Sequence, residues 1–257
     1  MKLGANCGSA DRWHLIRECG YDYAEGYFAG ITLAEDDEFQ KAWDFQKSAD
    51  IPIDVFNGFF TQKVTLLGEE KTSHVTIREY CEKGFFRAKA LGGKIAVIGS
   101  GKSRSIPDGM EKSRAEEEFL EALYLIAKIA IKNDMKIAIE PLRYAETNFI
   151  NTVEESISLC RLADHKAIGT IVDFFHFHSN GESLESLKNA KDLLFHVHIA
   201  RPDPDRRIPT EIDRETCLLW ADTLREIGYH DRITLEAIFA EDYASDLKAA
   251  FPIMKLF

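Results

Sequence analysis

Strand-like and helix-like segments alternate along nearly the whole chain of 257 residues. Runs rich in β-branched and aliphatic residues, as in parallel strands buried on both faces, recur at 2–6, 21–26, 51–57, 94–99, 136–141, 169–175, 194–200 and 233–238. No Ser-, Gly- or Pro-rich linker interrupts the series. Eight β-then-α units therefore predict α/β architecture, a single (β/α)8 TIM barrel over residues 1–257. An open doubly wound sheet is the alternative that periodicity alone leaves open.

Helix signals fall between the predicted strands. Patterns typical of capping boxes begin at Thr32, Ser113 and Thr152, each with a glutamate three residues later. Segment 113–131 carries apolar residues at helical spacing, which is the stripe expected of a helix packed on a sheet. These signals agree with a barrel whose strands are wrapped by helices.

Charge and cysteine content exclude several classes of protein. A net charge of −11 disfavours a nucleic-acid partner, because phosphate binding needs a basic surface. The five cysteines are widely spaced and form no C-x-x-C pair, which is typical of reduced thiols rather than of a disulfide framework. The N-terminal residues lack the apolar region of a signal peptide, and the most apolar stretch is too short to span a membrane. We therefore expect a cytoplasmic protein without a membrane partner.

Four of the predicted strands each end in one side chain of a type that binds metals. They read IAIEPL, TIVDFFH, FHVHIA and ITLEAI, and the side chains are Glu140, Asp173, His198 and Glu236. Buried strands rarely carry a lone acid, because an unpaired buried charge is costly. Three carboxylates about 4 Å apart would repel each other by roughly 4 kcal/mol per pair at an effective dielectric constant near 20. A divalent cation removes this repulsion, so the four residues predict a metal site.

The predicted barrel and the predicted metal site support each other. Functional groups of a (β/α)8 barrel lie at the carboxyl ends of its strands, and the four residues end strands 5 to 8. Taken alone, three of them have an ordinary explanation: Glu140 as a salt-bridged strand end, Asp173 as a loop cap and His198 as a hydrogen-bonded core histidine. Glu236 is unusual even alone. Their coincidence at successive strand ends favours the metal site. His196 shares a strand face with His198 but lies one layer deeper, so His198 is the predicted ligand.

The segment 99–103, GSGKS, imitates a phosphate-binding loop, with Ala96 in the place of the first glycine. Ala96 falls inside a predicted strand, and Pro107 and Gly109 follow where such a loop requires an immediate helix. We interpret the segment as a glycine-rich loop beside the site.

Across essentially its whole length, the chain resembles the xylose isomerase-like TIM barrels, the sugar phosphate isomerase/epimerase superfamily. Within it, the likeness is nearest to ketose 3-epimerases of the D-tagatose 3-epimerase type. The four strand-end residues, the run EPLRYAETNFINT, the segment FNGFF and the D-x-x-H formed by Asp173 and His176 carry the resemblance. It implies one divalent metal ion, with Mn²⁺ favoured and Co²⁺, Mg²⁺ and Zn²⁺ as alternatives. The implied ligands are Glu140, Asp173, His198 and Glu236.

The resemblance also implies residues that bind the substrate. Glu146, His176 and Arg207 match such positions, and Arg206 competes with Arg207 for the arginine position. Many members carry an acid shortly after the strand-7 histidines, where this chain has Ala200 and then Arg201, so the identity of the sugar stays open.

The activity that the resemblance implies is sugar epimerisation or aldose–ketose isomerisation. Glu140 and Glu236 would be the catalytic pair, transferring a proton next to a carbonyl through a metal-bound enediolate. The implied substrate is a ketose or a ketose-like small polyol, and a homodimer is implied by the likeness alone.

Three other functions are alternatives to a sugar epimerase or isomerase. A dehydratase of the inosose or dehydroshikimate type would begin with the same proton abstraction on the same barrel. An AP endonuclease would need further histidines after strands 3 and 4, where this chain has Asn57 and Ile98-Gly99. A sugar-binding protein with a vestigial site is disfavoured by the complete ligand set.

Overall fold

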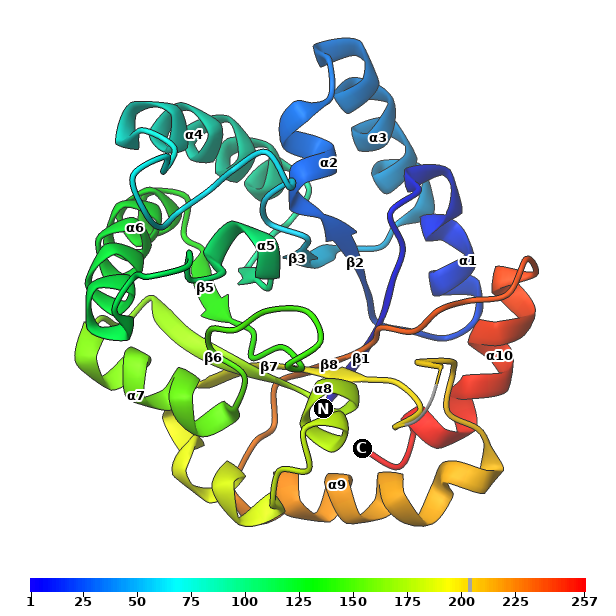
Figure 1. Ribbon diagram of the computed structural model, residues 1–257. Helices are drawn as coiled ribbons and strands as arrows, with labels where there is room; N and C mark the ends of the chain where they lie inside the picture. The colour runs from blue at the N-terminus through cyan, green and yellow to red at the C-terminus, as the bar shows by residue number, and fades with distance from the viewer. Residues whose placement is uncertain (203–204) are drawn as a thin grey trace.

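The computed structural model describes residues 1–202 and 205–257, and its strands close into one parallel barrel in sequence order, with β1 pairing β8 (Figure 1). The predicted (β/α)8 barrel is thus confirmed, and the open sheet is excluded. The strands are β1 (Lys2–Asn6), β2 (Tyr23–Tyr27), β3 (Ile53–Asn57), β4 (Ile95–Ile98), β5 (Lys136–Ile139), β6 (Ile168–Asp173), β7 (Leu194–Ile199) and β8 (Arg232–Leu235).

Helices follow the strands and surround them. Figure 1 shows helices such as α4, α6, α7 and α9 in an outer ring, whereas the short helices α5 and α8 are drawn inside that ring, after β4 and β6. The α-helices are α1 (Trp13–Glu18), α2 (Phe28–Leu33), α3 (Asp36–Ala49), α4 (His74–Ala90), α5 (Gly101–Arg104), α6 (Lys112–Lys132), α7 (Val153–Ala163), α8 (Phe174–Ser179), α9 (Arg214–Glu226) and α10 (Tyr243–Met254). Short 3₁₀ turns cover Ala10–Arg12, Leu184–Asn189, Lys191–Leu193 and Glu211–Asp213. In the described part of the chain, no helix combines the length and apolarity needed to cross a bilayer.

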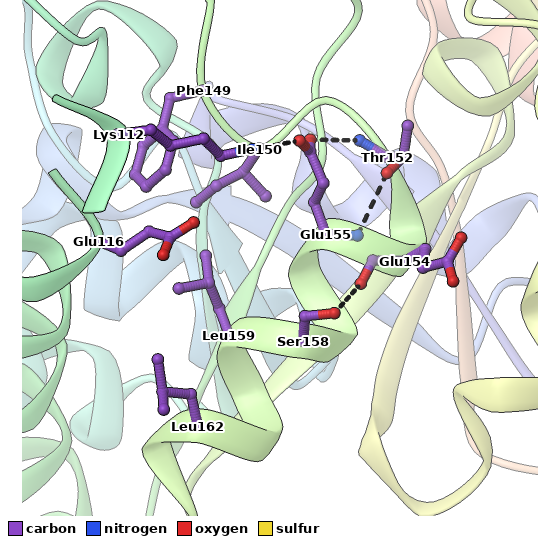
Figure 2. Close-up of a pocket in the computed structure, with 10 residues that line it drawn as sticks. All are labelled: Lys112, Glu116, Phe149, Ile150, Thr152, Glu154, Glu155, Ser158, Leu159 and Leu162. Carbon is purple, nitrogen blue, oxygen red and sulfur yellow. Dashed lines mark hydrogen bonds and ion pairs between the residues drawn. The ribbon is translucent and has the colours of Figure 1, made fainter.

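One of the three predicted capping boxes is present. Thr152 Oγ1 accepts a hydrogen bond from the backbone N–H of Glu155, whose carboxylate accepts one from the backbone N–H of Thr152, as Figure 2 shows at the start of α7. The other two predictions are wrong. Thr32 lies inside α2, where its hydroxyl donates to the Phe28 carbonyl, and α6 begins before Ser113. The helix after Thr32 is α3, which begins at Asp36 with a capping box of Glu35 and Glu38.

The main core lies between the strands and the helices, and the predicted apolar stripe of α6 is buried in it. A second, smaller cluster lies apart from it and is made by residues of β2 to β6: Tyr23, Val55, Ile95, Val97, Ala138 and Ile171. Tyr23 packs over Gly4 of β1, where an added Cβ atom would lie 2.3 Å from the ring. Its hydroxyl lies 2.8 Å from Thr234 Oγ1 of β8. The glycine therefore makes room for the largest side chain of this cluster.

A fully buried arginine holds the end of β4 against the residue that follows β5. The guanidinium of Arg104 in α5 donates to the carbonyl oxygens of Ile98 (2.9 Å), Glu140 (2.6 Å) and Phe149 (3.3 Å). Burial lowers the pKa of Arg104 to about 10, while Glu140 acts to raise it. Arg104 therefore stays charged at neutral pH and fixes the backbone from which the Glu140 side chain projects.

Replacing Gly4 by alanine should destabilise the barrel. The new methyl group would overlap the buried Tyr23 ring, and overpacking of this kind costs about 1–3 kcal/mol of unfolding free energy. The matched control is Gly30→Ala in α2, because Gly30 is exposed and the nearest atom to its added Cβ is 3.5 Å away. A helical Gly→Ala change should raise stability by about 0.5–1 kcal/mol. Urea unfolding followed by circular dichroism measures both, and a Gly4→Ala protein as stable as the wild type would contradict the prediction.

Candidate metal centre

The four predicted ligands meet at one end of the barrel. Each of Glu140, Asp173, His198 and Glu236 offers one ligand atom, and all four atoms lie within 4.8 Å of one another. His198 Nδ1 is 2.8 Å from Glu236 Oε2, 3.5 Å from Glu140 Oε1 and 3.8 Å from Asp173 Oδ2. Asp173 ends β6 and His198 lies in β7, while Glu140 and Glu236 directly follow β5 and β8. We call these four residues the metal cluster.

The chemistry of the metal cluster fits a divalent cation. His198 is fully buried, and its Nδ1 atom has no hydrogen-bond partner among the described residues. This nitrogen faces three carboxylates, so the cluster gathers one imidazole nitrogen and three carboxylate groups, each of which can donate an electron pair to a metal ion. Oxygen and imidazole ligands of this type suit several divalent ions. The cluster can therefore hold a metal ion.

The pKa values of the cluster residues respond to the charges of their neighbours. Burial raises the pKa of the Glu140 carboxyl, and the neighbouring Glu236 raises it further. Burial also acts to raise the pKa values of Asp173 and Glu236, but the Arg206 guanidinium and His198 together outweigh it and lower both. For His198, burial acts to lower the pKa, and the carboxylates, Glu236 foremost, outweigh it and raise the pKa well above its usual value. A positive charge close to the cluster therefore stabilises the ionised form of its carboxylates.

Arg206 supplies that charge from the loop after β7. Its Nη2 atom lies 2.5 Å from both Asp173 Oδ2 and Glu236 Oε2, and its Nη1 atom lies 3.4 Å from His176 Nε2. Arg207, the arginine favoured from the sequence, is instead exposed and pairs with Asp205. Arg206 has a positive φ of 51°, a left-handed turn that separates the directions of neighbouring side chains. The arginine that reaches the cluster is therefore Arg206, and Arg207 lies outside it.

His176 borders the cluster, and Glu146 lies beside His176; their role in substrate binding stays a prediction. His176 Nε2 is 3.7 Å from Asp173 Oδ2 and 3.9 Å from Glu140 Oε1, and its Nδ1 atom is 4.0 Å from Glu146 Oε1. Asp173 also caps α8, since its Oδ1 atom accepts a hydrogen bond from the backbone N–H of Phe175 (2.8 Å). One carboxylate thus performs both functions considered for it, the helix cap with one oxygen and a place in the cluster with the other.

Two residues beside the cluster were missed from the sequence. Glu25 of β2 is fully buried, and its carboxylate oxygens lie 3.0 Å from His196 Nε2 and 3.0 Å from His198 Nε2. Asn57, at the end of β3, donates from Nδ2 to Glu236 Oε1 at 2.5 Å. The strand-like run 21–26 carries two acids, Asp22 and Glu25, and Glu25 is the one that falls inside the strand β2. A buried strand acid is the same signal that revealed the metal cluster, so Glu25 could have been found. Asn57 carries no comparable signal, because an amide at a strand end is common.

An open cleft of about 360 Å³ adjoins the cluster at the loops after β3, β4 and β5, and Glu146 belongs to its lining. Lys102 also lines this cleft and donates to Gln62 at 3.3 Å. A larger groove of about 440 Å³ lies between α6 and α7, and Figure 2 shows its lining, which includes Leu159 and Leu162. Neither hollow has a residue of the metal cluster in its described lining. Glu146, which lines the cleft, lies 4.0 Å from His176, and His176 lies 3.7 Å from Asp173. The cleft after β3 to β5 is therefore the hollow that is linked to the cluster.

Comparison with known proteins gives relatives that are named epimerases or isomerases. A probable ketose 3-epimerase from Synechocystis sp. is 28% identical over 132 residues, which are 51% of this chain and 45% of that protein. An inosose isomerase from Bacillus subtilis is 28% identical over 204 residues, which are 73% of this chain and 69% of that protein. The chain thus spans about half the length of the first relative and about two thirds of the second.

Solved structures share the fold at lower identity. The 3-keto-D-glucoside 4-epimerase YcjR from E. coli aligns with a TM-score of 0.83 at 18% identity, covering 99% of both chains. The IOLI protein, whose crystal structure contains a zinc atom, aligns with a TM-score of 0.73 at 22% identity over 99% of this chain and 95% of that one. The sequence itself matches the family described as xylose isomerase-like TIM barrel over residues 13–251. The match covers most of the chain, and the chain therefore belongs to the xylose isomerase-like TIM barrel family.

Proposed function

We propose that this protein is a divalent-metal-dependent sugar epimerase or isomerase that transfers a proton next to a carbonyl group. The observation that carries the proposal is the convergence of Glu140, Asp173, His198 and Glu236 in one buried cluster. Relatives named ketose 3-epimerase and inosose isomerase support the substrate class, a ketose or a cyclic ketose-like polyol. The cleft beside the cluster admits a small molecule of this kind.

All four residues of the metal cluster would hold the ion, for which Mn²⁺ is the favoured choice and Co²⁺, Mg²⁺ and Zn²⁺ are alternatives. When bound, a divalent ion supplies Lewis-acid polarisation of the substrate carbonyl and stabilises the negative charge that develops on oxygen. Asp173 and His198 serve in this scheme as ligands only.

Glu140 and Glu236 serve in addition as the proton-transferring pair. They follow β5 and β8, which are separated by two strands, so they approach the cluster from different parts of the barrel wall. Arg104 bonds the backbone carbonyl of Glu140, and Asn57 donates to the carboxylate of Glu236, so both acids are fixed by neighbours. One carboxylate removes the proton next to the carbonyl, and the other returns a proton.

Groups around the rim would bind the hydroxyls of the substrate. His176 and Glu146 lie between the cluster and the cleft. We assign to Arg206 the substrate-binding role that the family resemblance implies for Arg207. Since an arginine side chain is long and has five N–H donors, Arg206 can hold a substrate oxygen when another cation neutralises the carboxylates.

The AP endonuclease alternative conflicts with local packing. The position after β4 is Gly99, and a Cβ atom added there would lie 1.8 Å from Glu140 Oε2. A histidine at this position would therefore displace a residue of the metal cluster, and at the end of β3 Asn57 is engaged with Glu236. A dehydratase uses the same first proton abstraction, and it is separated from an epimerase by its product, which has lost water.

Replacing either proton-transferring acid by its amide should abolish exchange. We expect Glu140→Gln and Glu236→Gln to slow incorporation of deuterium next to the carbonyl by at least about 10²–10⁴-fold, since each removes a general acid–base group. Proton NMR in D₂O with Mn²⁺-loaded protein and a panel of ketoses and inososes measures the exchange. Glu117→Gln, at an exposed position of α6, is the control and should exchange as the wild type does. Wild-type exchange in either amide variant would refute the assignment of that acid.

Gly99→Ala should weaken the metal site without unfolding the protein. The new methyl group would overlap the Glu140 carboxylate, which must then move out of the cluster. Displacing a ligand or its support costs about 10–100-fold in metal affinity. Titration with Mn²⁺ followed by electron paramagnetic resonance gives the dissociation constant, with Gly30→Ala as a control remote from the site. An unchanged dissociation constant in Gly99→Ala would show that Glu140 does not need its present position to bind the ion.

A further inference from the structure

One more buried carboxylate, outside the metal cluster, lies next to it, and the proposed chemistry does not use this carboxylate. Glu25 of β2 is fully buried. Its Oε2 atom is 3.0 Å from His196 Nε2, where the two side chains hydrogen-bond, and its Oε1 atom is 3.0 Å from His198 Nε2. An acid in this position would be strongly destabilising without such partners. Its retention inside the barrel calls for a function.

The two nitrogens of His198 face different groups. The Nδ1 atom points into the metal cluster, 2.8 Å from Glu236, whereas the Nε2 atom faces Glu25. Both nitrogens lie at these short distances from carboxylate oxygens without satisfying hydrogen-bond geometry with any described residue, and the same holds for Glu25 Oε1. A neutral imidazole carries its proton on one nitrogen and has a lone pair on the other. If His198 is to bind a cation through Nδ1, its proton must reside on Nε2.

An ionised carboxylate only accepts hydrogen bonds, so Glu25 favours the form of His198 that is protonated on Nε2. The same carboxylate engages His196, whose Nε2 atom also lies 3.1 Å from Thr234 Oγ1. Thr234 contacts Tyr23 in turn, at 2.8 Å. Glu25 is thereby held from below by a chain of buried polar groups, and it can hold the His198 ring from a fixed position.

We propose that Glu25 is a positioning residue of the metal centre. Its carboxylate accepts a hydrogen bond from the Nε2–H group of His198, and this leaves the lone pair of Nδ1 free to bind the ion. This inference rests on the proposed metal-dependent function. Carboxylates that orient a metal-binding histidine in this way typically contribute 10–100-fold to metal affinity, so an effect of about that size is expected here.

Glu25, His196 and His198 also gather three ligand atoms within 4.8 Å of one another, which raises the alternative that they hold an ion themselves. His198 would then have to give Nε2 to one ion and Nδ1 to another, and would lose its ring proton. A positioning role needs no such deprotonation. The two alternatives differ in the number of ions bound, which is one under our proposal.

The test is metal binding by the Glu25→Gln variant. The amide keeps the shape of the side chain and one acceptor oxygen, but its other end is an NH₂ donor and it carries no negative charge. It can therefore no longer offer an acceptor oxygen to both His196 and His198. Isothermal titration with Zn²⁺ and with Mn²⁺ should show one ion per chain in both proteins and a dissociation constant raised about 10–100-fold in the variant. The control is Glu117→Gln, the same change at an exposed acid of α6 that lies outside the buried chain. Its dissociation constant should stay within about twofold of the wild-type value, because exposed substitutions of this kind have small effects.

A second measurement needs no variant. In the zinc-loaded wild type, ¹⁵N NMR of the histidine rings should show His198 protonated on Nε2 and bound to metal through Nδ1. Equal affinities of Glu25→Gln and wild type, a loss of one of two bound ions, or metal on Nε2 of His198 would each overturn the positioning role. A wild-type protein that binds neither ion would overturn the proposed metal dependence itself, and the inference with it.

Discussion

Mutual repulsion among buried carboxylates is the constraint on which the rest of this structure depends. Closing a parallel barrel brings the carboxyl ends of its strands together, and here those ends carry Glu140, Asp173 and Glu236. At about 4 Å each pair repels by roughly 4 kcal/mol at an effective dielectric constant near 20, which is comparable to the whole stability margin of many domains. The protein offsets this with positive charge, from Arg206 above the cluster and from the raised proton affinity of His198 within it. A bound divalent ion would replace this positive charge with one centred among the ligands.

The same constraint explains why the site is held so firmly. A carboxylate that is repelled by its neighbours will turn away unless its surroundings fix it. Asp173 caps a helix with one oxygen, Glu236 accepts from Asn57, and Arg104 binds the carbonyl of Glu140. Each contact uses an element adjacent to the strand end, so the barrel wall supplies the support. The site is thus built before any ion arrives, which lowers the cost of binding one.

The barrel and the metal cluster could be predicted from the sequence because both signals are local. Apolar runs and lone strand-end acids are read within a few residues, and the (β/α)8 arrangement then brings the acids together. Arg206 could not be chosen over Arg207, because the choice depends on a left-handed φ within an irregular loop. The cap predicted at Thr32 failed because Thr32 already lies inside α2, and the next helix is capped by Glu35 and Glu38 instead. Glu25 could have been found by the argument that revealed the cluster. It was overlooked because it lies in the middle of β2 rather than at the end of the strand.

Depth inside the barrel separates the tasks of the molecule. An apolar cluster around Tyr23 adjoins a polar group made by Glu25, His196 and Thr234, and the metal cluster lies beyond His198. In the proposed function these inner groups would act on the ion and on the two proton-transferring acids, and none of their residues is among the described residues that line the cleft. The cleft belongs to the loops after β3, β4 and β5, where Lys102 donates to Gln62. We therefore expect the reaction type to depend on the barrel interior and the choice of sugar to depend on these loops.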